Sequence, residues 1–93
     1  MNIQIDPHTL ERAEERGTNA DEIKDVILSG TSIPAKFSRL GKTKIYDFKK
    51  NRLGTYYEQK RVEVYFVVQG DVTITVAVYV FYGKWEKEDG NPI

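Results

Sequence analysis

The sequence contains no cysteine, one histidine and one tryptophan among its 93 residues. The absence of cysteine excludes disulfides, thiolate nucleophiles and cysteine zinc sites. The remaining metal ligands are His8 and the carboxylates, and they occur in no His-x-x-x-His, HExxH or EF-hand spacing. We therefore expect neither a metal nor any other cofactor.

Long apolar runs and a targeting signal are also lacking. The chain begins Met-Asn-Ile-Gln-Ile-Asp, without a basic start or an apolar stretch, which predicts a cytoplasmic protein with no membrane association. No P-loop and no serine nucleophile elbow is present. With 40% apolar and 30% charged residues, the composition predicts one globular domain over 1–93, with its core at about 7–86 and a tail at 87–93.

The charge is balanced overall but divided along the chain. Residues 1–30 carry seven acids and three bases, whereas residues 36–61 carry nine bases and two acids. The basic segment also contains five aromatic residues that can stack on bases, so it predicts a surface for polyanions. An equally open interpretation is a half-exposed strand with a solvated face. The candidate nucleic-acid-binding residues are Lys44, Lys49, Arg52, Arg61 and Trp85.

Two short helices are predicted near the N-terminus. Asp6 is a favourable N-cap for a first helix over 7–16, which Gly17 ends. A capping box at 19–22 opens a second helix that stops at Gly30. We expect the two helices to form a hairpin and to pack on a sheet, because two short helices alone cannot make a core.

The second half of the chain predicts strands. A strand is expected at 45–48, a turn at 49–52 and a further strand from 55 onward. Before them, residues 31–42 are expected to be a connection, with room for a short edge strand at 35–40. The fold class is therefore α+β, with two N-terminal helices packed on a twisted antiparallel sheet.

The strongest predicted element is a hairpin whose turn is Gly70-Asp71. This turn pairs Gln69 with Val72 and Val67 with Ile74. Continued without interruption, the register also pairs Tyr65 with Val76 and Glu63 with Val78, and it places Val78 and Val80 on one face and Ala77 and Tyr79 on the other. Both faces are then largely apolar, so each needs a cover, which leaves open a second subunit or a bound partner.

His8, Arg12 and Arg16 follow one another at helical spacing. The helix N-terminus favours a neutral imidazole at His8, which suits a general base. The competing interpretation is a solvated helix face with an Arg12–Glu15 pair, because the stripe points away from the apolar side of the helix. At the end of the last strand, Tyr82, Lys84 and Trp85 combine a phenol, a cation and a stacking surface, or they simply close one end of the core.

The helix signature H-x-x-x-R-x-x-x-R-G and the final strand V-T-I-T-V-A-V-Y-V-F-Y-G-K-W resemble a family of small prokaryotic domains. That family is related to the RelE, ParE and BrnT toxins, within the α+β ribonucleases that include barnase and colicin D. The resemblance covers about residues 7–86 and implies a RelE-like fold with a concave sheet surface for RNA.

The resemblance also implies an activity, which is metal-independent endoribonuclease cleavage in a toxin-antitoxin system. A base, an acid and cations are needed for this reaction. His8 is the candidate acid/base, and Arg12 and Arg16 are supporting cations. Lys60, Tyr82 and Lys84 are added as catalytic candidates on chemical grounds. The expected partners are RNA, an antitoxin-like protein or a second copy of the chain, and the alternative function is a non-enzymatic protein-interaction module or an inactive toxin relative.

Overall fold

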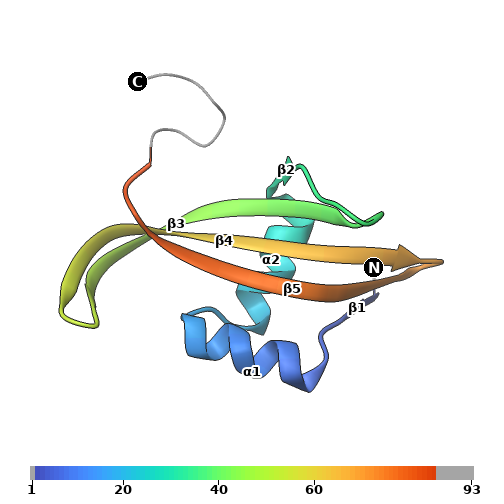
Figure 1. Cartoon of the computed structure of the whole chain (residues 1–93), viewed down its shortest axis with the longest axis horizontal. Helices are drawn as coiled ribbons and strands as arrows, with labels where there is room; N and C mark the ends of the chain where they lie inside the picture. The colour runs from blue at the N-terminus through green and yellow to red at the C-terminus, as the bar shows by residue number, and fades with distance from the viewer. Residues whose placement is uncertain (1, 86–93) are drawn as a thin grey trace.

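A computed structural model describes residues 2–85 and has the predicted α+β class (Figure 1). Five strands form one sheet in the order β1-β5-β4-β3-β2. Neighbouring strands are antiparallel except β1, which runs parallel to β5, so the sheet is mixed. The elements are β1 (Asn2–Gln4), α1 (Pro7–Arg16), α2 (Ala20–Ser29), β2 (Thr31–Ile33), β3 (Leu40–Arg52), β4 (Thr55–Gln69) and β5 (Val72–Gly83).

Both helices begin and end where the sequence predicts. The Asp6 side chain accepts a hydrogen bond from the Thr9 amide at 3.0 Å, which satisfies one of the unpaired amides at the start of α1. Gly17 ends α1 with φ of 101°, the left-handed conformation that glycine adopts without a steric penalty. Asn19 caps α2 by accepting a hydrogen bond from the Glu22 amide at 2.8 Å.

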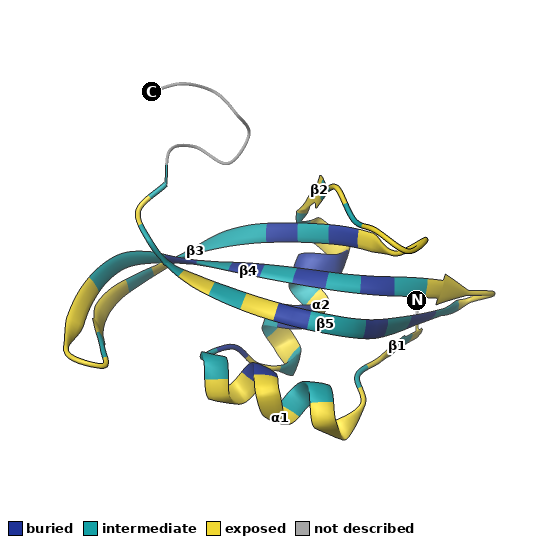
Figure 2. Cartoon of the chain, in the orientation of Figure 1, coloured by how far each residue is buried: buried dark blue, intermediate teal, exposed yellow. Residues whose placement is uncertain are grey.

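The prediction of a helical hairpin is wrong, because each helix packs on the sheet separately. α1 contacts β5, whereas α2 crosses behind β3 and β4 (Figure 1). Their buried side chains meet one face of the sheet, where the deeply buried positions lie in the middle of the strands (Figure 2). The core consists of Ala13, Ile23, Val26, Ile27, Val62, Val64, Phe66 and Val78.

The packed part of the chain begins earlier than residue 7. β1 pairs with the first residues of β5, and Ile3 and Ile5 pack against the core. The edge strand expected at 35–40 is instead β2, at 31–33, followed by a loop that leads into β3. The predicted tail at 87–93 lies outside the described residues.

The hairpin of β4 and β5 has the predicted turn but not the whole predicted register. Gln69 pairs with Val72 and Val67 with Ile74, as expected. A bulge then shifts the pairing, so that Tyr65 lies opposite Ala77 rather than Val76. The extra residue exchanges the two faces of β5 from that point on.

The bulge decides which side chains of β5 are buried. Val78 is 2% exposed and joins the helix-covered core, although the uninterrupted register places it on the same face as Tyr65. Tyr79 and Phe81 turn to the opposite face, which neither α1 nor α2 covers, and are 43% and 44% exposed. We call the side of the sheet that carries Tyr65, Tyr79 and Phe81 the open face.

The hairpin of β3 and β4 is longer than predicted. Its turn is Leu53-Gly54, both with positive φ, rather than residues 49–52. The sequence does not indicate the turn at Leu53-Gly54, because leucine is an unusual residue in a left-handed position. Residues 50–57 therefore extend beyond Gln59 and Gly83, the last pair of β4 and β5, as an arm that curves away from the sheet (Figure 1).

Candidate functional site

The stripe of His8, Arg12 and Arg16 faces a hollow between α1 and the outer edge of β5. This α1 hollow has a volume of about 260 Å³. Because residues four apart lie on one side of a helix, α1 presents all three side chains to it. Its lining residues are His8, Thr9, Arg12, Arg16, Val76, Ala77, Val78 and Tyr79.

His8 and Arg12 are exposed, as the solvated helix face predicts, but Arg12 contacts His8 rather than Glu15, and Arg16 is half-buried. Arg12 donates from Nε to Nε2 of His8 at 3.0 Å, a contact that requires an unprotonated Nε2. Arg16 donates from Nη1 to the Val78 carbonyl at 2.8 Å, and its guanidinium carbon lies 5.3 Å from the centre of the Tyr79 ring. Arg16 thus reaches around the edge of β5 to the open face.

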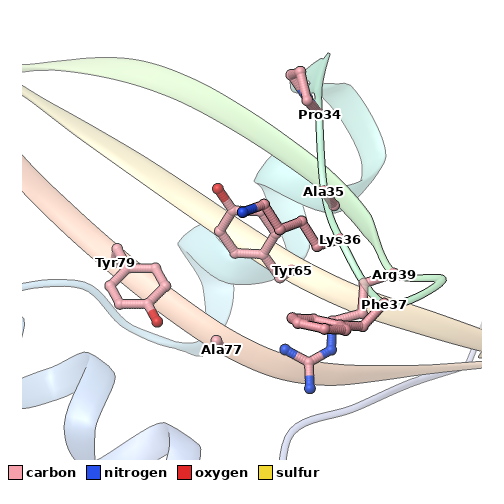
Figure 3. Close-up of a pocket in the computed structure, with 8 residues that line it drawn as sticks. All are labelled: Pro34, Ala35, Lys36, Phe37, Arg39, Tyr65, Ala77 and Tyr79. Atoms are coloured by element: carbon pink, nitrogen blue, oxygen red, sulfur yellow. The ribbon is translucent and has the colours of Figure 1, made fainter.

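A second hollow lies on the open face under the loop between β2 and β3 (Figure 3). This loop hollow has a volume of about 330 Å³. Phe37 and Ser38 hold the loop with φ near 60°, and the Arg39 guanidinium lies 5.8 Å from the Phe37 ring centre. The lining residues are Pro34, Ala35, Lys36, Phe37, Arg39, Tyr65, Ala77 and Tyr79.

The two hollows share Ala77 and Tyr79, so they adjoin on β5. We call their combination the β5 groove. The described residues that line it include cations at both ends and aromatic rings between them, and no carboxylate is among them. The Tyr65 and Tyr79 rings meet edge to face with their centres 6.0 Å apart. Such a lining suits an anionic ligand that carries flat rings.

Lys60 and Tyr82, two predicted catalytic residues, lie on the helix-covered face instead. Lys60 is buried and donates to the Gly17 carbonyl and to Oε1 of Glu22, both at 2.8 Å. Tyr82 donates to the Arg16 carbonyl at 2.6 Å, and burial raises the pKa of this phenol. Both side chains satisfy carbonyls at the end of α1, where helical partners are lacking and positive charge is favoured.

Of the predicted nucleic-acid-binding cations, two are likewise engaged at the helices. Arg52 donates to the Glu15 carbonyl at 2.9 Å, which adds a third side chain at the end of α1. Lys44 donates to Oδ2 of Asp25 at 2.7 Å. With the hydrogen bonds from Tyr46 and Ser29, this contact lowers the pKa of Asp25 to about 2. Lys49 is exposed on β3, and Lys84 is exposed just beyond β5.

Arg61 and Trp85 lie on the open face, outside the β5 groove. Arg61 pairs with Glu63 at 2.5 Å, and its guanidinium carbon is 5.5 Å from the Phe81 ring centre and 5.7 Å from that of Trp85. The Trp85 amide donates to Oε1 of Gln59 at 2.6 Å, which fixes the backbone where the chain leaves β5.

Of the residues that line the β5 groove, the sequence predicts His8, Arg12 and Arg16 as site residues and misses the others. Tyr65 and Tyr79 carry no motif, and without the bulge they fall on opposite faces. Lys36, Phe37 and Arg39 belong to the basic aromatic segment, but nothing in their spacing shows that the loop folds over β5. Burial raises the pKa of Tyr65, and the nearby Glu63 carboxylate raises it further, so this phenol remains neutral at physiological pH.

Within residues 2–85, no group of three or more histidine, aspartate or glutamate side chains is arranged to hold a metal ion. No helix in the same part of the chain is long and apolar enough to cross a membrane. In comparisons with known proteins, no family model, no curated protein and no solved structure matches the chain.

Proposed function

We propose that the protein is a toxin-like RNA-binding domain that holds a single strand in the β5 groove. The observation that carries this proposal is the lining of the groove by residues 2–85, with Arg12 and Arg16 at one end, Lys36 and Arg39 at the other, aromatic rings between them and no carboxylate within that range. Phosphates are attracted to both ends, and bases stack on the rings. The residues of the H-x-x-x-R-x-x-x-R-G signature supply one end, in line with the RelE-like resemblance.

A phosphate in the α1 hollow also meets the groups needed for cleavage without a metal. Arg12 turns from His8 to the phosphate, which frees Nε2 of the imidazole. His8 then takes the proton of the ribose 2′-hydroxyl as its oxygen attacks the adjacent phosphorus. The 5′-oxygen leaves with a proton returned by the imidazolium, and a 2′,3′-cyclic phosphate remains. Arg12 and Arg16 stabilise the charge that develops on the phosphorane.

RNA binding is tested with a labelled single-stranded oligonucleotide at about 50 and 200 mM salt. We expect affinity to fall steeply with salt, and Arg12→Gln to weaken binding about tenfold and to reduce the salt slope by about one phosphate contact. Lys24→Gln is the matched control, since it removes the same charge from an exposed position on α2 outside the groove. Equal effects of the two substitutions contradict binding in the groove.

Cleavage is tested separately, with RNA and chelator present. We expect products with 2′,3′-cyclic phosphate ends, and loss of at least 100-fold of the rate in His8→Gln while RNA binding is retained. Full activity in His8→Gln removes the catalytic assignment but leaves the binding proposal intact. Growth arrest on expression without a partner would support the toxin-like part of the proposal.

The exposed rings of Tyr79 and Phe81 favour a second candidate, a module that binds an antitoxin-like protein or another copy of the chain. Apolar association of this kind is insensitive to salt, in contrast to phosphate binding. Salt-insensitive self-association or partner binding, together with no affinity for RNA, would favour this candidate.

A further inference from the structure

Beyond the β5 groove, aromatic rings continue along the open face of β5. Tyr79 lines the groove, Phe81 follows two residues later, and both are more than 40% exposed. Successive residues of one strand face are about 6.8 Å apart, a spacing that suits one nucleotide of an extended strand. The row therefore leads out of the groove towards the end of β5.

Trp85 extends the row because of how it lies on Gly83. An atom added as a side chain at Gly83 would lie 3.5 Å from the indole, in ordinary van der Waals contact, so the ring of Trp85 lies over the side of Gly83 where a side chain would point. Residue 83 has the same parity as Tyr79 and Phe81, and it pairs with Gln59, which binds the Trp85 amide. Tyr79, Phe81 and the indole thus follow one another on one face.

A guanidinium lies near each ring. Arg16 lies over Tyr79, and the guanidinium of Arg61 lies within 6 Å of both the Phe81 and the Trp85 ring centres. Because Glu63 neutralises Arg61, this guanidinium holds the two rings and adds little attraction for phosphate. Lys84, the residue before Trp85 in the chain, is exposed.

We infer that the RNA strand runs from the β5 groove along the open face, with Tyr79, Phe81 and Trp85 as three successive base platforms. This inference rests on the proposed RNA binding and extends it to a direction and a length. Charge complementarity selects a polyanion, since the row joins a groove lined by cations. A dinucleotide fills the groove alone, whereas a hexanucleotide also reaches Phe81 and Trp85.

Trp85 is the only tryptophan of the chain, so its fluorescence reports on the far end of the row. We use 2′-O-methyl oligoadenylates, which lack the attacking hydroxyl and stay intact. The hexanucleotide is expected to quench the fluorescence and to bind at least tenfold more tightly than the dinucleotide, which leaves the fluorescence unchanged. Removal of one stacking ring weakens binding by roughly 5- to 150-fold per base.

Phe81→Ala is therefore expected to weaken binding of the hexanucleotide by that factor and to change binding of the dinucleotide little. Tyr56→Ala is the matched control, because it removes an exposed ring from the arm of β3 and β4, and both ligands should bind it as they bind the unchanged protein. Urea unfolding midpoints of both variants check that each is folded.

Each outcome separates the path from the proposed function. If the hexanucleotide binds without quenching, and Phe81→Ala binds it as the unchanged protein does, the path is overturned and RNA binding stands. If neither oligonucleotide binds, both are overturned. Quenching that depends on protein concentration without RNA also overturns the path, because it identifies the row as a contact between copies of the chain.

Discussion

On the helix-covered face of the sheet Lys60 and Lys44 each meet a carboxylate of α2, whereas on the open face Lys36 and Arg39 line a hollow without one. All four belong to the same basic segment of the sequence. Those on the covered face satisfy groups of the fold itself, and those on the loop remain at the surface. A cluster of cations in the sequence therefore identifies a ligand site only after the strand register assigns each cation to a face.

The largest difference between the faces concerns two phenylalanines. Phe66, which is 5% exposed, packs in the core, so Phe66→Ala is expected to lower the free energy of unfolding by about 3–5 kcal/mol. Phe81→Ala on the open face should cost about 1 kcal/mol, since much of that ring already contacts water. Urea unfolding of both variants measures the difference. Similar losses would show that the open face is covered in solution.

The next effect concerns two lysines. Lys60→Met leaves the Glu22 carboxylate and the Gly17 carbonyl without their cation, and we expect a loss of about 3 kcal/mol. Lys84→Met, at an exposed position, should change stability by less than about 0.5 kcal/mol. Thermal or urea unfolding distinguishes the two. A small effect of Lys60→Met would mean that water replaces the lysine at the end of α1.

The smallest effect depends on pH. The pKa of Asp25 is lowered by hydrogen bonds from Lys44, Tyr46 and Ser29, so its contribution to stability is complete above about pH 4 and is lost as the pH falls through about 2. The unchanged protein should therefore have a higher free energy of unfolding than Asp25→Asn at pH 5, and this difference should shrink as the pH falls to 2. Urea midpoints at pH 5, 3 and 2 measure it, with Asp21→Asn on the same helix as the control. An advantage that does not vary with pH would contradict this assignment.

The helices were predictable because their signals are local. Asp6, Gly17 and Asn19 act on backbone groups within three or four residues, and their side chains alone define where α1 and α2 begin or end. The spacing of His8, Arg12 and Arg16 likewise predicts that they share a side of α1. These features depend on no distant part of the chain.

The sheet was harder to predict because its register depends on distant partners. No residue type marks the bulge between β4 and β5, and Leu53 is a poor turn former on its own. The end of α1 is held by Lys60 and Tyr82, more than 40 residues away, and their chemistry alone resembles that of a catalytic acid. Such roles follow from tertiary contacts, which composition and spacing do not encode.

The bulge in β5 also sets a reading frame for the strand. Because side chains alternate, the single unpaired residue assigns every later position of β5 either to the interior or to the surface. Deletion of Val76 would restore an uninterrupted ladder and would leave Val78 in the core and Tyr79 on the open face, because Ala77 would still pair with Tyr65. If Val76 instead paired with Tyr65, Val78 and Tyr79 would change places between the interior and the ligand surface, so the strand keeps its two faces only while Val76 stays out of the ladder.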